Sequence, residues 1–164
     1  MKKSILSFLF LGMISFSFVP TPKEKIDKEN DANVLTWQTS FDDAMKLAKK
    51  KKKPLLVFFT GSDWCGPCKM LHADLFENEE FITLANKKLI LYKADFPRNG
   101  GSVVTPEQKL KNSELQSKYG VGGFPTVIML NAKNEVIGKQ VGYNRKQTTT
   151  YHLKMINDAI EKYK

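Results

Sequence analysis

Apolar and polar positions alternate along the chain in a pattern that predicts a succession of strands and helices. Continuous apolar runs such as 55–60 are typical of buried strands, whereas apolar residues at helical spacing indicate helices that bury one face. We expect strands at 34–39, 55–60, 89–96, 126–130 and 135–141, and helices at 41–52, 65–76, 79–86, 107–119 and 148–163. This alternation, which ends in a hairpin and a helix, predicts an α/β fold, a three-layer α/β/α sandwich around one central sheet.

Short-range signals set the boundaries of several elements. Ser40 followed by Asp43 is typical of a helix N-cap, and residues 131–134 are expected to form the turn of the hairpin. The apolar face of the final helix is expected to contain Tyr151, Met155, Ile156, Ala159 and Ile160. The segment Phe96–Pro106, which contains Arg98, is interpreted as a surface excursion, and we favour a tolerated insertion over a role in partner choice.

The first residues have the pattern of a secretory signal. Lys2 and Lys3 precede the uncharged, mostly apolar run 4–19, and Ser15 and Ser17 are small residues at the spacing that signal peptidase requires. We therefore expect cleavage after Ser17 and export, with an uncleaved membrane anchor as the alternative. The expected organisation is a signal peptide at 1–17, a flexible lead-in at 18–33 and one domain at 34–164.

Composition and charge narrow the classes of partner. A chain of 164 residues with 41% hydrophobic residues has the size and the core of one domain. Its formal net charge of +9 includes the run Lys49–Lys53, which lies at the end of a predicted helix, where cations complement the helix dipole. Because no aromatic residues interleave with this run, we do not expect nucleic-acid binding. The positive charge still allows weak attraction to acidic partners or lipid head groups.

The two cysteines, Cys65 and Cys68, lie where a predicted strand gives way to a helix. A disulfide across so short a ring adds only about 2 kcal/mol of stability, so a purely structural bridge is a poor use of the pair. Together with His72 the cysteines offer three metal ligands, and a metal carrier is retained as an alternative. A dithiol–disulfide cycle fits best, because a helix N-terminus favours the thiolate and the spacing keeps both sulfurs within reach. Pro67 suits the first helical turn, and Trp64 supplies an apolar wall beside the attacking sulfur.

Two motifs carry a resemblance to a known family. The segment Trp64-Cys65-Gly66-Pro67-Cys68-Lys69 resembles the active-site motif of thioredoxin, and Gly122-Gly123-Phe124-Pro125-Thr126 is similar to the cis-proline loop of that family. Residues 59–65, 75–76 and 95–98 more closely resemble exported bacterial thioredoxin-like proteins and the C-terminal thioredoxin domain of transmembrane disulfide reductases. The resemblance covers about 34–164 and implies the thioredoxin fold, with a central mixed sheet and a cis-proline loop.

The resemblance also assigns roles to individual residues. It implies that Cys65 is the exposed nucleophile, that Cys68 is the buried resolving thiol, and that Pro125 is cis and faces the disulfide. An extended substrate peptide is expected to pair with the backbone beside Pro125, where Gly123 permits close approach and Phe124 offers an apolar contact.

The function that the resemblance implies is thiol–disulfide exchange outside the cytosol. The Gly66-Pro67 dipeptide resembles the reducing members, so we expect a periplasmic protein-disulfide reductase. Its substrates are expected to be disulfide-bonded proteins, and its electron donor a membrane disulfide reductase. No cofactor and no metal ion are expected, and the domain is expected to act as a monomer. The alternatives are a protein disulfide oxidase or isomerase, and a thioredoxin-fold binding module with incidental redox activity.

One position departs from the family pattern. Thioredoxins carry a buried Asp in the strand before the active-site motif, and alignment places Phe58 at that position. The Lys that accompanies this Asp on the next strand is expected to be replaced by Leu91. Asp63 is expected to be solvated or to form a turn rather than to replace the buried carboxylate. The sequence therefore leaves the route of the Cys68 proton unassigned.

Overall fold

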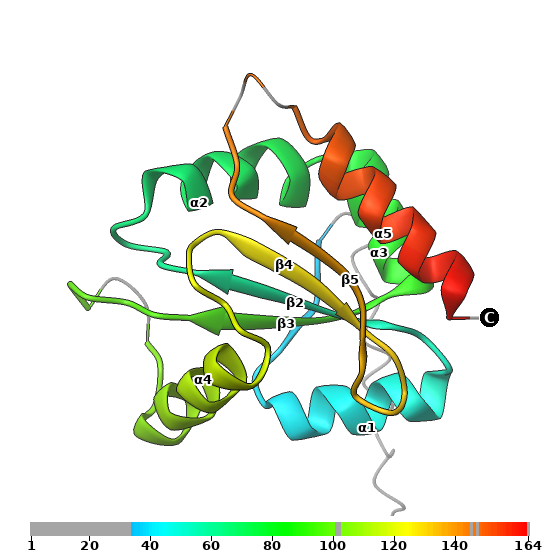
Figure 1. Cartoon of the computed structure of the whole chain (residues 1–164), viewed down its shortest axis with the longest axis horizontal. Helices are drawn as coiled ribbons and strands as arrows, with labels where there is room; N and C mark the ends of the chain where they lie inside the picture. The colour runs from blue at the N-terminus through cyan, green and yellow to red at the C-terminus, as the bar shows by residue number, and fades with distance from the viewer. Residues whose placement is uncertain (1–33, 101–102, 145, 147, 164) are drawn as a thin grey trace, which may run out of the picture.

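The described part of the chain, residues 34–163 without 101, 102, 145 and 147, contains one five-stranded mixed sheet in this computed structural model (Figure 1). The strands are β1 (Trp37–Gln38), β2 (Leu55–Thr60), β3 (Ile90–Asp95), β4 (Thr126–Leu130) and β5 (Val136–Val141). Their order is β1-β3-β2-β4-β5, in which β3 is parallel to β1 and β2, and β4 is antiparallel to β2 and β5. The predicted mixed sheet is confirmed, whereas the predicted signal peptide (1–17) and lead-in (18–33) lie outside the described residues.

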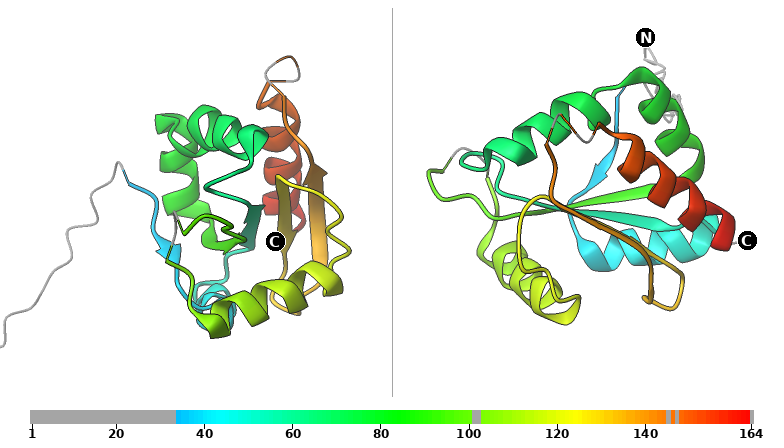
Figure 2. Two further views of the ribbon diagram at one scale, coloured as in Figure 1. Left: turned by 90° about the vertical axis from the view of Figure 1, so that its left-hand side faces the viewer. Right: turned by 45° about the horizontal axis from the view of Figure 1, so that its top comes forward.

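Helices cover both faces of this sheet and produce the three expected layers (Figure 1, Figure 2). They are α1 (Phe41–Lys51), α2 (Gly66–Leu71), which continues through a π-helical turn at His72–Phe76, α3 (Glu79–Lys88), α4 (Pro106–Lys118) and α5 (Thr150–Lys162). α1 and α4 pack on one face, and α2, α3 and α5 pack on the other. No helix among the described residues is long and apolar enough to span a membrane.

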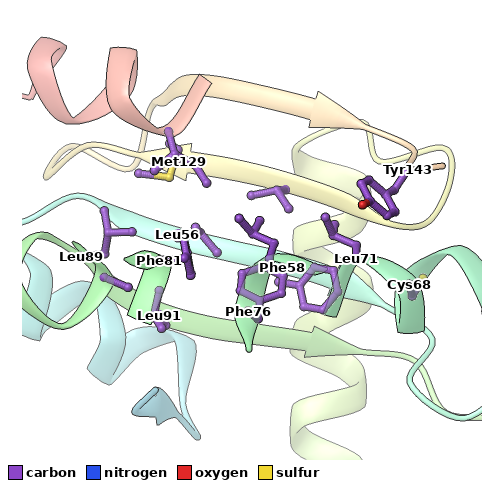
Figure 3. Packing of buried hydrophobic residues seen from close by; sticks show 14 of the residues in the cluster. Leu56, Phe58, Cys68, Leu71, Phe76, Phe81, Leu89, Leu91, Met129 and Tyr143 are labelled. Carbon is purple, nitrogen blue, oxygen red and sulfur yellow. The ribbon is translucent and has the colours of Figure 1, made fainter. Parts of the chain in front are cut away.

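β2 is the central strand, and every one of its residues is buried. Because side chains alternate across a strand, Leu56 and Phe58 join the core beneath α2, α3 and α5, while Val57 and Phe59 join the core beneath α1 and α4. Figure 3 shows Phe58 beside Phe76 in the first of these cores. A strand that is buried on both faces is held firmly, so the loop at its C-terminal end starts from a rigid support.

The local capping signals of the sequence are confirmed. The Oγ of Ser40 accepts a hydrogen bond from the backbone N–H of Asp43 at 3.3 Å and caps α1. In the hairpin turn, the Asn131 side chain accepts hydrogen bonds from the N–H groups of Lys133 and Glu135. These short-range bonds fix where α1 begins and where β4 turns into β5.

The face predicted for α5 is partly wrong. Tyr151 is 59% exposed, whereas its neighbour His152 is 2% exposed and lies on the buried side with Ile156 and Ala159. Adjacent positions of a helix point about 100° apart, so a small error in helix phase exchanges a buried residue with its neighbour.

Candidate redox site

The two cysteines form a disulfide at the junction between β2 and α2. The Cα atoms of Cys65 and Cys68 lie 5.3 Å apart. Cys65 is the N-cap residue of α2, and its Sγ accepts a hydrogen bond from the backbone N–H of Cys68 at 3.3 Å. Pro67 lies in the first turn, where a missing N–H costs no helical hydrogen bond. The N–H and the helix dipole at this end stabilise negative charge on Sγ, which favours the thiolate of Cys65 once the disulfide is reduced.

Both cysteines are buried in the disulfide form. Cys65 is 4% exposed and Cys68 is 1% exposed, so the expectation that Cys65 is exposed is wrong for this form. Trp64 and Phe124, both half-buried, pack against the core cluster that contains Cys65. Gly66 is exposed, and no neighbouring atom lies within 4 Å of the point where a side chain would begin. The surface over Gly66, next to Cys65, is therefore open.

The indole of Trp64 is held in place from two sides. Its Nε1–H donates a hydrogen bond to the backbone carbonyl of Phe96 at 2.8 Å. Gly61 lies under the ring, and a Cβ at this position would lie 2.4 to 2.7 Å from three ring atoms. The chain therefore approaches the indole more closely than any residue with a side chain allows.

We expect a Gly61→Ala substitution to displace the indole and to lower the free energy of unfolding by about 1–3 kcal/mol, the usual cost of overpacking. The measurement is urea denaturation combined with tryptophan fluorescence. Gly122→Ala is the matched control, because no atom lies within 4 Å of a Cβ built there. Equal unfolding midpoints for the two variants would show that Gly61 does not hold the indole.

The surface excursion after β3 is bound to the redox loop. The Asp63 carboxylate accepts hydrogen bonds from the backbone N–H groups of Arg98 and Asn99. The Arg98 guanidinium lies over the Trp64 ring, 3.7 Å from its centroid. Asp63 is therefore neither a free solvated carboxylate nor a local turn former, contrary to expectation. Arg98 and Asn99, at the start of the excursion, therefore contact the redox loop.

Phe58, which the sequence analysis aligns with the buried acid of thioredoxins, is 1% exposed. Figure 3 shows it among the packed apolar side chains. The residue paired with Phe58 in the parallel β2–β3 register is Lys93, whereas Leu91 pairs with Leu56. The expectation that Leu91 replaces the accompanying lysine is therefore wrong, because Lys93 stands beside Phe58. Burial lowers the pKa of Lys93, and nearby Asp95 partly opposes this shift.

A cavity of about 350 Å³ lies behind Cys68. Its charged or titratable lining groups among the described residues are Cys68, Lys69, His72, Glu77 and Lys93. The Nδ1 atom of His72 lies 3.1 Å from Oε1 of Glu77. Cys68 therefore borders a cavity whose lining also contains two lysines, one histidine and one carboxylate.

The three ligands of the metal alternative are not assembled in the disulfide form. Cys65 and Cys68 are bonded to each other, and His72 is paired with Glu77. Across the part of the chain that the structure describes, no group of three or more His, Cys, Asp or Glu side chains is placed to hold a metal ion.

The second sequence motif lies beside the first. The peptide bond between Phe124 and Pro125 is cis. The Phe124 ring contacts the Trp64 ring at a centroid distance of 6.0 Å and stacks on Phe96 at 5.0 Å. The Thr126 hydroxyl donates to the carbonyl of Gly123 at 2.7 Å and closes the loop. The two motifs therefore form one surface around the disulfide.

The sequence analysis did not identify Lys93 as a residue of this site, and it named Arg98 without predicting its contact with Trp64. A single lysine inside the apolar strand 89–96 was the available signal for Lys93, because a charge there needs a cavity or a partner. No local pattern identifies Arg98, since its contact with Trp64 joins two loops that are distant in sequence.

Comparisons with known proteins agree with this geometry. The model of the thioredoxin-like domain family matches residues 41–157. The disulfide bond reductase DsbH of Chlamydia pneumoniae is 33% identical over 105 residues, which cover 64% of this chain and 61% of that protein. The thioredoxin-related protein DsbJ of the same species is 27% identical over 129 residues, which cover 75% of this chain and 36% of that protein. The chain thus spans less than two thirds of the length of either relative.

A solved structure of the oxidoreductase DsbH has the same fold. It superposes with a TM-score of 0.68 at 28% sequence identity, and the match covers 78% of this chain and 85% of that one. The family match includes β2, the cysteine pair and the Phe124–Pro125 loop, all of which the structure brings together. The chain belongs to the thioredoxin-like family.

Proposed function

We propose that this protein is a thiol–disulfide oxidoreductase that reduces protein disulfides with Cys65 and Cys68. The observation that carries the proposal is the disulfide at the N-terminus of α2, where Sγ of Cys65 accepts the Cys68 N–H. This arrangement stabilises a thiolate at Cys65 and holds the second sulfur close enough to displace it. The open surface over Gly66 supports an approach of the substrate disulfide from this side.

The reaction transfers two electrons from the dithiol to the substrate. The Cys65 thiolate attacks one sulfur of the substrate disulfide, a mixed disulfide forms, and the other substrate sulfur leaves as a thiolate that takes up a proton. The Cys68 thiol then loses its proton and attacks Sγ of Cys65. The Cys65–Cys68 disulfide forms, and the second substrate thiol is released. One protein disulfide is reduced for each pair of enzyme thiols oxidised.

The direction of the reaction rests on two supports. The Gly66-Pro67 dipeptide between the cysteines resembles that of reducing thioredoxins. The relative DsbH is described as a disulfide bond reductase. Both favour a reductase over an oxidase or isomerase.

The proposed setting is the periplasm, or the outer face of the membrane if the N-terminal segment remains as an anchor. The apolar run 4–19 supports export, and a reductase outside the cytosol needs an external source of electrons. A membrane disulfide reductase that hands electrons to the Cys65–Cys68 disulfide fulfils this need. Fractionation of cells that produce the full chain tests this location.

Insulin reduction tests the proposed activity. We expect the protein to accelerate the precipitation of insulin B chains in dithiothreitol. We expect it to refold scrambled ribonuclease only slowly when no reductant is added. The opposite pattern, efficient refolding of scrambled ribonuclease with no insulin reduction, would establish an isomerase or oxidase instead.

A further inference from the structure

A groove of about 370 Å³ borders Trp64, the residue before Cys65, and the reaction steps above do not use it. Its wall contains Trp64, Phe96 and Phe124, and its rim contains Arg98 and Lys109. The wall includes the residue that precedes Cys65 and the residue that precedes Pro125. A segment of substrate that extends from the attacked disulfide can therefore enter this groove.

The three rings of the aromatic wall are connected by ring contacts. Phe124 stacks on Phe96 and also contacts the Trp64 ring. The hydrogen bond from Trp64 Nε1 to the Phe96 carbonyl fixes the angle between these loops. A preformed, half-buried aromatic surface binds an apolar side chain without a large cost in ordering.

The rim of the groove is positively charged. The Arg98 guanidinium lies over the Trp64 ring, 3.7 Å from its centroid, and the Arg98 side chain is exposed. This contact favours one placement of the guanidinium, whose N–H groups can donate to a planar acceptor. Lys109 extends from the first turns of α4 and is exposed. Within the described residues, neither side chain forms an ion pair.

The acidic groups near the rim are occupied by other bonds. Asp95 is 4% exposed, and its carboxylate accepts hydrogen bonds from the backbone N–H of Ser62 at 2.9 Å and from its hydroxyl at 2.6 Å. The Asp63 carboxylate accepts the N–H groups of Arg98 and Asn99. Neither acid neutralises the Arg98 guanidinium through a direct ion pair.

We propose that this groove selects substrate segments that carry an acidic side chain close to the cysteine. Arg98 binds the carboxylate in a bidentate manner, Lys109 adds a second positive charge, and the aromatic wall holds an apolar neighbour. The inference rests on the proposed function and names its substrate class: disulfide-bonded segments that are both acidic and apolar next to the attacked cysteine.

Reduction of designed peptides tests this selection. The probes are disulfide-linked peptides with a quenched fluorophore, identical except for one Glu or one Lys, which is placed in turn at each of the three positions on either side of the cysteine. At one or more positions we expect kcat/KM to be about tenfold higher for the Glu peptide, a preference that decreases as salt is added. An Arg98→Glu/Lys109→Glu variant is expected to reverse the preference, and a milder Arg98→Gln/Lys109→Gln variant is expected to remove it.

A Lys50→Glu/Lys133→Glu variant is the matched control. It makes the same change in net charge with two exposed lysines at the other end of the sheet, and we expect it to keep the preference for Glu. Equal rates for the Glu and Lys peptides at every position, or a preference that the reversed variant retains, would overturn the inference while leaving the proposed reductase intact. A protein that reduces none of the peptides and no insulin would overturn both.

Discussion

A Cys65→Ser variant is expected to reduce insulin no faster than dithiothreitol alone. Cys65 carries the Sγ that accepts the Cys68 N–H, and we propose this sulfur as the nucleophile. Serine has a far higher pKa than a thiol at the same position and does not attack a disulfide under these conditions. Insulin turnover at the wild-type rate in this variant would exclude Cys65 as the nucleophile.

The Cys68→Ser variant is expected to fail at the second step instead. Its Cys65 still attacks the substrate, but no second sulfur is present to release it, so a mixed disulfide accumulates. Mass spectrometry and non-reducing electrophoresis detect this adduct. Each variant is the control for the other, because both lose the disulfide that joins the two cysteines. If the Cys65→Ser variant traps an adduct on Cys68 and Cys68→Ser traps none, then Cys68 is the nucleophile and Cys65 is the resolving thiol.

Acid is expected to destabilise the fold through His152. This side chain is 2% exposed, and within the described structure neither of its ring nitrogens has a hydrogen-bond partner. Burial lowers its pKa from 6.5 to about 4. The unfolded chain therefore binds a proton at a higher pH than the folded chain does, and stability falls as the pH falls. The loss begins near pH 6.5 and approaches about 3 kcal/mol below about pH 4.

Urea denaturation at pH 7 and pH 4.5 measures this effect. The Tyr143 ring packs edge-on against His152 at 5.7 Å, so His152→Phe keeps an aromatic contact and removes the titrating group. We expect this variant to lose much less stability in acid than the wild type. His72→Gln alters the other histidine of the chain. This variant is expected to lose as much stability in acid as the wild type, since His152 is unchanged. If the free energy of unfolding of His152→Phe falls as much between pH 7 and pH 4.5 as that of the wild type, the loss is due to other groups.

The parts of the fold that were predictable rest on local chemistry. The Ser40 cap, the Asn131 turn and the buried run of β2 depend on residues that are neighbours in sequence, so a pattern is enough to identify them. The position of Cys65 and Cys68 at the start of α2 follows for the same reason, because it depends on the order of one strand, one loop and one helix.

The parts that were missed depend on long-range register. Whether Leu91 or Lys93 lies beside Phe58 is decided by how β3 pairs with β2, which the sequence of either strand alone does not state. The bonds from Asp63 to the Arg98 loop likewise join segments that meet only after the sheet has formed. The burial of Cys65 was missed because it depends on how closely distant loops pack over it.

The reduction potential of the Cys65–Cys68 pair tests the proposed reductase most directly. Equilibration in glutathione or dithiothreitol buffers, followed by alkylation of free thiols, gives the ratio of dithiol to disulfide. We expect a value near that of thioredoxin, about −270 mV, at which the dithiol readily gives electrons to protein disulfides. A value near about −120 mV, typical of a strong periplasmic oxidant, or the absence of a reversible couple, would contradict the proposal.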